Sequence, residues 1–392
     1  MEIARTWSAE PIANWSDPVL MQPATDGRRT MKITIAGAGI AGLTAALVLG
    51  RLGHKVAVLE RSPRINPQGA GIVLAPNALR VLSALRVKVK RCGEPIRRLT
   101  IRDAAGNALE TTDIARILPD AGPTLAFHRA ELHQALLEAL SPKVELRLGA
   151  PLVDCAAAAG DLLIGADGIR SRVREQSGGS MRLRYSGETC WRALAPNPGI
   201  EEGFEAWGGA ARVGVIPLTQ SRLYVYLVLT APPGEERQIR IDNIRQSFAH
   251  FGAPVPAILD SLAGVELLHH DLEELHEPVW GSGNVLLIGD AAHAMTPNLG
   301  QGAAMGIEDA AILPQVIAAP DPARRLRDLR HQRVWRVQRD SRRFGAIAHW
   351  HSQPAIWLRN TLVRRMPRSL ADRNYRAVVG PGLALDLVAL AD

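Results

Sequence analysis

Asp290 and the residues around it are the clearest candidates for a binding or catalytic site in this chain of 392 residues. The apolar residues 285–288 precede Gly289-Asp290, a pattern that predicts a short buried strand ending in a turn. A carboxylate at the end of a strand can accept hydrogen bonds from the hydroxyl groups of a polyol. The alternative is an ordinary strand-turn-helix corner in which the aspartate caps the helix.

A helix is predicted to begin soon after this turn, at Gly300-Gln301-Gly302, and to continue through Ala303. Pro297 stiffens the loop in between, because its ring fixes φ. Glycines at a helix start let backbone N–H groups approach a ligand, and the positive helix end favours an electron-rich or anionic group. A flavin offers both partners, since its ribityl chain carries hydroxyl groups and its N1–C2 edge becomes anionic on reduction.

The glycines of residues 37–42, GAGIAG, predict a nucleotide-binding turn. They lie between a predicted strand and a predicted helix, residues 43–52. In this arrangement Gly37 permits the tight turn, Gly39 lets a pyrophosphate approach, and Gly42 lets the helix pack closely on the strand.

Glu60 supports the same interpretation from a second position. It ends the next predicted strand, residues 56–59, and lies eighteen residues after Gly42. This spacing is typical of an acid that binds a ribose. The pattern therefore predicts dinucleotide binding, with NAD and FAD as the two alternatives.

A third turn, Asp167-Gly168, ends a further predicted strand, residues 162–164. Alone it would be an everyday turn. The order of the three motifs, however, resembles the class A single-component FAD-dependent aromatic monooxygenases, which have the para-hydroxybenzoate hydroxylase fold. The resemblance covers residues 31–367. It implies an α/β fold in which a Rossmann-like FAD-binding domain carries an inserted, mostly antiparallel β-sheet substrate domain and C-terminal helices.

This resemblance assigns roles that the spacing alone does not give. It implies that Asp167 touches both FAD and the nicotinamide donor, that Asp290 holds the ribityl chain, and that Arg129 lies beside the ribityl and diphosphate groups. Pro297 is expected against the flavin ring, and small residues in the loop 69–73 allow the flavin to move. The residues implied to bind the cofactor are Gly37, Gly39, Ala41, Gly42, Glu60, Arg61, Val73, Arg129, Asp167, Gly168, Gly289, Asp290, Pro297, Gly300, Gln301, Gly302 and Ala303.

The resemblance also implies the reaction. NADH or NADPH reduces FAD, the reduced flavin adds dioxygen to give a C4a-hydroperoxide, and the distal oxygen moves to a nucleophilic carbon of a small aromatic substrate. Arg212 and Tyr224 lie on adjacent predicted strands, where relatives place an arginine and a tyrosine near the substrate, and are the candidate catalytic residues. An exposed strand arginine and a core tyrosine are the alternatives. His293 is expected to pack near the flavin rather than to act as an acid or base.

Four further segments narrow the expected substrate, because they resemble members of this family that hydroxylate 2-alkyl-4-quinolones at ring carbon 3. They are residues 186–192, 223–226, 270–275 and 357–364. A 4-quinolone also fits the absence of an obvious catalytic base, since its vinylogous amide already makes carbon 3 nucleophilic. Salicylate-like or urate-like substrates remain alternatives. So do a non-catalytic flavin-binding sensor and a flavin-binding reductase of isoprenoid chains.

The predicted elements divide the chain into discontinuous domains. Residues 31–96, 128–180 and 271–325 are assigned to the FAD-binding domain, residues 97–127 and 181–270 to the substrate domain, and residues 326–392 to a C-terminal helical region. Residues 1–30 lack the charged start and apolar centre of a signal peptide, and we expect a disordered leader there, with Met31 as an alternative start. Residues 151–161 are too few for the hairpin that is usual in this family.

Composition excludes several other classes of protein. No run of eighteen apolar residues predicts a membrane span, and Cys92, Cys155 and Cys190 have no metal-binding or disulfide spacing, which fits a reduced cytoplasm. The net charge of +7 comes mainly from arginines of residues 324–376. Because aromatic residues for base stacking are few, we expect a solvated basic helical face there rather than nucleic-acid binding. Weak peripheral membrane contact through residues 357–370 is an alternative, and the protein is expected to be a monomer or a homodimer.

Overall fold

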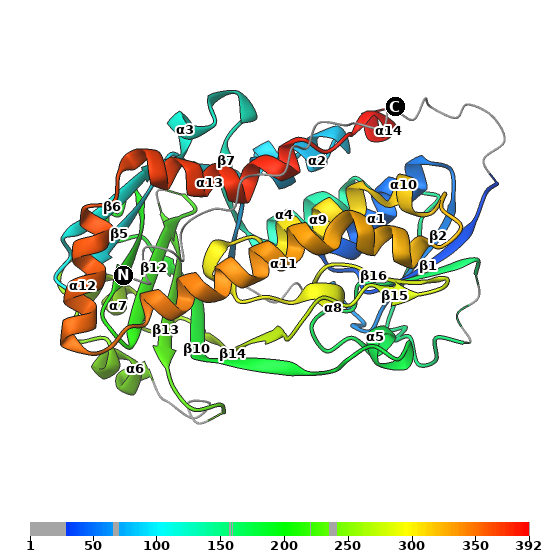
Figure 1. The fold of residues 1–392 in the computed structure, drawn as a ribbon. Helices are drawn as coiled ribbons and strands as arrows, with labels where there is room; N and C mark the ends of the chain where they lie inside the picture. The colour runs from blue at the N-terminus through cyan, green and yellow to red at the C-terminus, as the bar shows by residue number, and fades with distance from the viewer. Residues whose placement is uncertain are drawn as a thin grey trace. The chain divides into compact units, whose positions relative to one another are not determined.

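A six-stranded, mostly parallel sheet frames the candidate site in the computed structural model (Figure 1). The strands lie in the order β15-β16-β9-β1-β2-β8, and every neighbouring pair except β15 and β16 is parallel. They are β1 (Lys32–Ala36), β2 (Lys55–Glu60), β8 (Glu145–Leu148), β9 (Leu162–Gly165), β15 (Gly281–Ser282) and β16 (Val285–Leu287). Because the adjacent parallel strands β16, β9 and β1 end at the same edge, the turns that follow them meet there.

The structure describes residues 29–65, 70–156, 158, 160–219, 221–234 and 241–391. Residues 1–28 of the expected leader and Gly69 of the loop expected beside the flavin lie outside the described residues. Residues 31–392 form one unit by their contacts, so the expected domain boundaries within it remain a prediction. The described part of residues 149–161 contains no strand, as the short length of this segment led us to expect.

Two helices pack closely beside the parallel sheet. They are α1 (Ile40–Arg51) and α9 (Gly302–Ala311), and both are largely apolar and buried. A Cβ added to Gly306 of α9 would lie 2.9 Å from the Cβ of Ala41 in α1. Small residues at this crossing therefore let the two helices approach, and Ala41 lies at a helix contact next to the nucleotide turn.

A seven-stranded sheet forms the second part of the fold, in the order β14-β10-β13-β12-β11-β5-β6. Its strands are β5 (Arg98–Asp103), β6 (Ala108–Asp113), β10 (Leu183–Pro196), β11 (Gly203–Trp207), β12 (Ala211–Pro217), β13 (Arg222–Thr230) and β14 (Leu268–Leu275). Only the β11–β5 pair of this sheet is parallel among the described residues. One face packs its apolar side chains against α6 (Ile241–Ser247) and α7 (Val255–Ser261). The expected mostly antiparallel substrate sheet is confirmed.

Short elements connect the two sheets. A three-stranded sheet has the order β3-β7-β4. The connecting elements are β3 (Gly71–Leu74), α2 (Pro76–Ala84), η1 (Val89–Arg91), β4 (Gly93–Ile96), α3 (Ile114–Ile117), η2 (Pro119–Ala121), β7 (Thr124–His128), α4 (Arg129–Glu138), α5 (Arg172–Gln176), α8 (Asp290–His293), η4 (Pro297–Leu299) and α10 (Leu313–Val316). Two of these elements, β3 and α4, matter most for the site, because β3 lies against β10 and α4 begins with Arg129.

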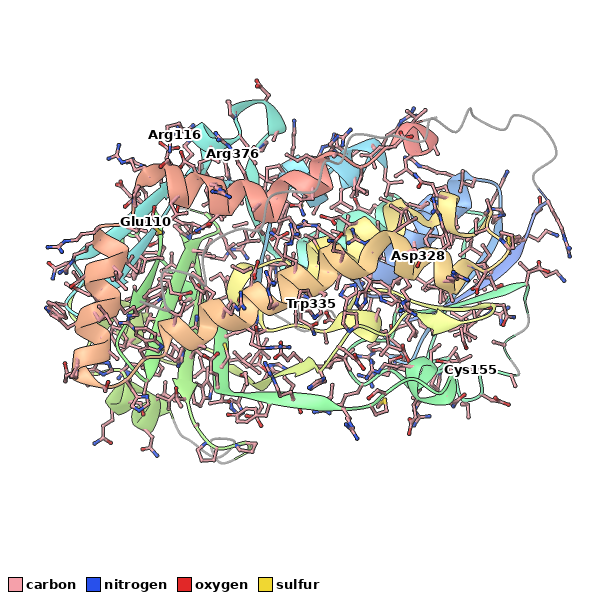
Figure 2. The ribbon with its side chains drawn as sticks, viewed as in Figure 1. Glu110, Arg116, Cys155, Asp328, Trp335 and Arg376 are labelled. Atoms are coloured by element: carbon pink, nitrogen blue, oxygen red, sulfur yellow. The ribbon has the colours of Figure 1, made fainter. Side chains whose placement is uncertain are left out.

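Four helices complete the chain: α11 (Pro322–Ala348), α12 (Gln353–Arg364), α13 (Arg368–Leu383) and α14 (Val388–Ala391). In Figure 1, α11 runs from the parallel sheet towards the antiparallel sheet. Arg116 and Arg376, which lie close together in Figure 2, connect α3 and α13, since Arg116 pairs with Asp372 at 2.7 Å and Arg376 donates to the carbonyl of Ile117. None of the described helices is long and apolar enough to cross a membrane.

Candidate functional site

The nucleotide turn after β1 has the geometry that a dinucleotide requires. Gly37 has φ of +104°, and a Cβ there would lie 2.4 Å from the carbonyl oxygen of Ala166. A Cβ on Gly42 would lie 2.0 Å from the carbonyl oxygen of Gly37. At Gly39, by contrast, a Cβ would meet nothing within 4 Å, so this backbone faces open space that a pyrophosphate can enter.

Glu60 lies beside this turn at the end of β2. Its carboxylate accepts hydrogen bonds from the backbone N–H of Ala38 and of Ser62, both at 2.9 Å. Each carboxylate oxygen keeps further lone pairs, so Glu60 can also accept the hydroxyl groups of a ribose. The next residue, Arg61, is exposed at the same edge. His133 of α4, which the sequence did not single out, bonds the Ala38 carbonyl at 2.6 Å and supports the turn from the other side.

Asp167 follows β9 and offers one free acceptor atom. Its Oδ2 accepts the backbone N–H groups of Arg172 and Val173, at 2.8 and 3.2 Å, and so caps α5. Its Oδ1 is buried and has no hydrogen-bond partner. Gly168 has φ of +84° and open space around it. An unpaired buried acceptor beside open backbone fits a hydroxyl group of FAD.

Asp290 follows β16 as the first residue of α8 and is exposed. Its carboxylate accepts no hydrogen bond from the described residues, and it faces the start of α9, because a Cβ on Gly302 would lie 3.9 Å from Oδ1. The preceding Gly289 needs its positive φ of 59°, and a Cβ there would lie 2.9 Å from the Ala41 side chain. The turn thus leaves one carboxylate open next to a helix N-terminus.

Gln301, which was expected to bind the cofactor, is buried as the N-cap of α9 and accepts a hydrogen bond from Asn77 at 3.1 Å. Pro297 begins η4 and Gly300 follows its last residue, and both are exposed, while Ala303 is half-buried in the first turn of α9. These positions lie in the segment that leads into α9, where Gly302 is the residue shown near Asp290. Their contact with a cofactor remains a prediction.

A buried ionic cluster behind this corner was not foreseen from the sequence. Asp309 of α9 accepts from the Gly289 N–H at 3.0 Å, bonds His293 at 2.6 Å and pairs with Arg330 at 2.7 Å. Arg330 also pairs with Glu308 at 2.8 Å. Burial alone would raise the pKa of Asp309, but His293 and Arg330 lower that pKa to about 2. The cluster fixes the Gly-Asp turn to α11, and His293 has a structural partner.

This cluster corrects one expectation about the basic region, residues 324–376. Arg330 is 2% exposed and Arg333 is 7% exposed, and both pair with Glu308. The interpretation as a solvated basic face is therefore wrong for these two arginines. The arginines lie on the inner side of an amphipathic helix, and their acidic partners, more than twenty residues away in the sequence, cannot be read from local pattern.

Tyr224 lies where the antiparallel sheet meets β3. It is 9% exposed, and a Cβ on Gly71 would lie 2.2 Å from its Cγ, so the ring packs flat against the backbone of β3. Val73 of the same strand packs in its apolar cluster. Burial raises the pKa of Tyr224 to about 12. Its hydroxyl group forms no hydrogen bond within the described residues and is available to a ligand.

Arg129 lies near Tyr224 at the start of α4. Burial lowers the pKa of its guanidinium, while Asp290 and Tyr224 act in the opposite direction. It forms no ion pair with the described residues. A guanidinium without an anionic partner fits the diphosphate or ribityl groups that it was expected to bind.

Arg212 is 1% exposed and its donors are occupied by protein groups. The guanidinium pairs with Glu188 and Glu205, both at 3.2 Å, and donates to Asn298 at 2.8 Å and to His349. Asn298 follows Pro297 and is held from its other side by the Ser341 carbonyl at 3.0 Å. Arg212 is thus neither an exposed strand residue nor open to a ligand, and it can act on the chemistry by positioning the Pro297 loop. Its role as a catalytic residue remains a prediction.

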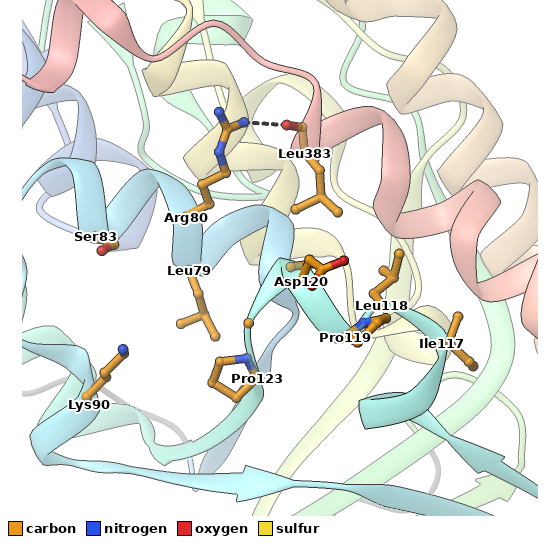
Figure 3. Close-up of a pocket in the computed structure, with 12 residues that line it drawn as sticks. Leu79, Arg80, Ser83, Lys90, Ile117, Leu118, Pro119, Asp120, Pro123 and Leu383 are labelled. Carbon is orange, nitrogen blue, oxygen red and sulfur yellow. Dashed lines mark hydrogen bonds between the residues drawn. The ribbon is translucent and has the colours of Figure 1, made fainter.

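A groove of about 770 Å³ lies outside this site (Figure 3). It is bounded by α2, by residues 117–123 and by the end of α13, where Arg80 donates to the carbonyl of Leu383. Leu79 and Pro123 form part of its wall. None of the residues expected to bind cofactor or substrate lines this groove, so it is separate from the flavin site.

Comparison with known families agrees with this geometry. Residues 30–148 and 157–325 match a family model described as FAD binding domain. The chain belongs to this family of class A FAD-dependent monooxygenases, with the para-hydroxybenzoate hydroxylase fold. The expected fold class, enzyme class and FAD cofactor are confirmed.

Individual relatives cover nearly the whole chain. The 2-heptyl-3-hydroxy-4(1H)-quinolone synthase of Pseudomonas aeruginosa is 36% identical over 386 residues, which are 90% of this chain and 99% of the relative. The aurachin C monooxygenase/isomerase of Stigmatella aurantiaca is 31% identical over 88% of this chain and 97% of its own length. The crystal structure of a variant of Klebsiella pneumoniae HpxO complexed with FAD has a TM-score of 0.77 and 25% identity, covering 89% of this chain and 98% of that chain. The relatives therefore include an enzyme whose name refers to a hydroxylated quinolone.

Proposed function

We propose that this aromatic monooxygenase uses NADH or NADPH and dioxygen to hydroxylate ring carbon 3 of a 2-alkyl-4-quinolone in the cytoplasm. The observation that carries the proposal is the 36% identity, over nearly the full length of both chains, to a relative named for a 3-hydroxy-4-quinolone. The surroundings of Tyr224 support it, because apolar side chains pack around its ring, while its hydroxyl group and the guanidinium of Arg129 form no hydrogen bond or ion pair with the described residues. Such a combination suits a flat ring that carries one oxygen and an alkyl tail.

The chemistry of the site matches a substrate that needs little acid–base help. The nitrogen lone pair of a 4-quinolone already makes carbon 3 nucleophilic. Tyr224, with a pKa of about 12, stays protonated at neutral pH and can donate a hydrogen bond to substrate. Leu194 and Ile216 pack in the same cluster as Tyr224, and such apolar side chains would exclude water from a ring bound against them. Bound FAD supplies the redox centre that activates dioxygen.

The proposal is tested by screening aromatic heterocycles, beginning with 2-heptyl-4-quinolone, against the purified holoenzyme. We expect the quinolone to accelerate oxidation of NADH or NADPH, and mass spectrometry to detect a product with one additional oxygen. Parallel assays with the two nucleotides identify the electron donor. If salicylate-like or urate-like compounds are hydroxylated and the quinolone is not, the enzyme belongs to another substrate branch. If no compound stimulates nucleotide oxidation, a flavin-binding sensor replaces the enzymatic proposal.

We also propose that α12 rests weakly on an anionic lipid surface, from which a greasy substrate could be drawn. Trp357 and Leu362 are 69% and 48% exposed on this helix, and Leu358 lies between them on the same side. Four arginines of residues 341–371 are exposed, Arg343, Arg364, Arg365 and Arg368, and this segment contains no acidic residue. An exposed apolar face beside basic residues is typical of an interfacial helix, and the anionic surface supplies the complementary charge.

Co-sedimentation with vesicles tests this contact. The protein is expected to bind vesicles of phosphatidylcholine with phosphatidylglycerol more strongly than phosphatidylcholine alone. The double variant Trp357→Ala, Leu362→Ala should lose this binding while its FAD content stays unchanged. Trp335→Ala on α11, where the ring is 45% exposed, is the matched control. Equal binding by both variants would refute the contact, and light scattering that shows a homodimer broken by Trp357→Ala would assign this face to a second copy of the chain.

A further inference from the structure

Arg192 is a cation of the substrate sheet that lies within electrostatic reach of Tyr224. It lies on β10, directly opposite Tyr226 of β13. Its neighbours Trp191 and Ala193 point into the core beneath α6 and α7. Because successive side chains of a strand point to opposite faces, Arg192 points to the face that carries Tyr224.

Two guanidinium groups, those of Arg192 and Arg129, lie near the single carboxylate of Asp290. Arg192 and Arg129 lie within electrostatic range of each other, and Asp290 and Tyr224 act on both. Neither arginine has an ion pair among the described residues. The thiol of Cys190, which bonds Arg192, has a pKa raised by burial and stays neutral. A half-buried cation without an anion is unfavourable, so the pair calls for negative charge from ligands.

The positions of Arg129 and Arg192 favour a different ligand for each arginine. Arg129 begins α4, and its backbone N–H bonds the Ala70 carbonyl at 3.2 Å on the flavin side. Arg192 lies on the substrate sheet, within two residues of Leu194, which packs with Tyr224. Arg129 is therefore placed to bind the cofactor, and Arg192 is placed to bind the substrate.

We propose that Arg192 orients the aromatic substrate by binding its oxygen substituent, which is the 4-oxo group of a quinolone. This inference rests on the proposed function. The planar guanidinium can donate N–H groups that converge on one oxygen carrying partial negative charge. With that oxygen held by Arg192 and the ring held by the apolar wall, the carbon next to the oxygen-bearing carbon is presented for reaction. Arg192 thus selects aromatics with an oxygen beside the reacting position.

The test compares two ligands on the holoenzyme, 2-heptyl-4-quinolone and 2-heptylquinoline, which lacks the oxygen. Arg192→Gln should weaken binding of the quinolone about 10- to 150-fold, as expected for a hydrogen bond to a charged group, while binding of 2-heptylquinoline stays within about twofold. Arg192→Lys should recover part of the loss, since it keeps the charge without the fork. Quenching of flavin fluorescence measures the dissociation constants, and KM should rise more than kcat falls.

Three results would overturn the role of Arg192. Equal weakening of both ligands would assign it to packing, and unchanged binding of the quinolone would assign it no role. Loss of FAD from Arg192→Gln would make it a cofactor ligand instead. If the wild-type enzyme binds no quinolone but hydroxylates another aromatic, the proposed substrate fails; the same comparison is then made with that aromatic and its counterpart lacking the oxygen, and it still decides the role of Arg192.

Discussion

At the scale of single residues, Asp290 and Asp309 show how two aspartates of one corner serve different purposes. Asp290 is exposed and accepts no hydrogen bond from the described residues. Asp309 is fully buried and is held by His293, Arg330 and the backbone of Gly289. The first is free to bind a ligand, and the second fixes the turn from which the first projects.

Substitution should separate these purposes. Asp290→Ala is expected to leave stability of the apoprotein unchanged but to weaken FAD binding by roughly 1.5–3 kcal/mol, the value of a hydrogen bond to an ionised group. Asp309→Asn is expected to destabilise the apoprotein by about 1–3 kcal/mol, because it removes a buried charge that binds both His293 and Arg330, although Arg330 keeps Glu308 as its second partner. Urea unfolding of the apoproteins and titration with FAD measure the two effects. An Asp290→Ala protein that keeps its full yellow flavin content would contradict the assignment.

At the scale of elements, α11 acts as a clamp between the two sheets. Arg330 near its middle holds the Gly-Asp turn, Ser341 accepts from Asn298 in the Pro297 loop, and His349 at its end accepts from Arg212 of β12. Arg212 in turn donates to Asn298. The loop expected against the flavin is thus held from both the helix and the substrate sheet.

Loosening this loop should uncouple oxygen activation from hydroxylation. Arg212→Lys keeps a positive charge but cannot bond four partners in a plane, so more hydrogen peroxide per NAD(P)H is expected. Asn298→Ala breaks the same connection from the loop side and should have the same effect. Tyr224→Phe keeps the ring on Gly71 and should instead raise KM. The amounts of hydrogen peroxide and of hydroxylated product formed per NAD(P)H consumed measure this coupling. Normal coupling in Asn298→Ala would show that Arg212 does not act through the loop. If both Arg212→Lys and Tyr224→Phe leave turnover and coupling untouched, neither residue serves the substrate.

At the scale of the whole molecule, the sequence alone predicts those parts of the fold whose signal lies within one segment of the chain. The strand, GAGIAG turn and helix of residues 31–52 appear as β1 and α1, because glycine chemistry and apolar periodicity act within one segment. The cluster around Asp309 could not be foreseen, since its partners meet only when α9 and α11 pack. Arg192 was missed for a related reason. Its direction follows from the register of β10 with its neighbouring strands, which no local pattern encodes.

The stability of the whole chain should depend on pH through His349. Burial, followed by Arg212 and Arg359, lowers the pKa of His349 to about 2. The unfolded state binds a proton below about pH 6.5 and the folded state does not, so this residue stabilises the fold above that pH and loses the contribution as pH falls. His349→Gln should therefore cost most stability at pH 7.5, with the cost narrowing towards pH 5. Urea unfolding at each pH measures this, and a constant difference between the two proteins would contradict it.

The turns after β1, β9 and β16 come from widely separated parts of the chain, and α11 must be in place to brace the last of them. A growing polypeptide therefore lacks a complete flavin-binding site until the turn after β16 and helix α11 have left the ribosome. Incorporation of the pigment is a late event in the life of each molecule, and chains released early emerge colourless.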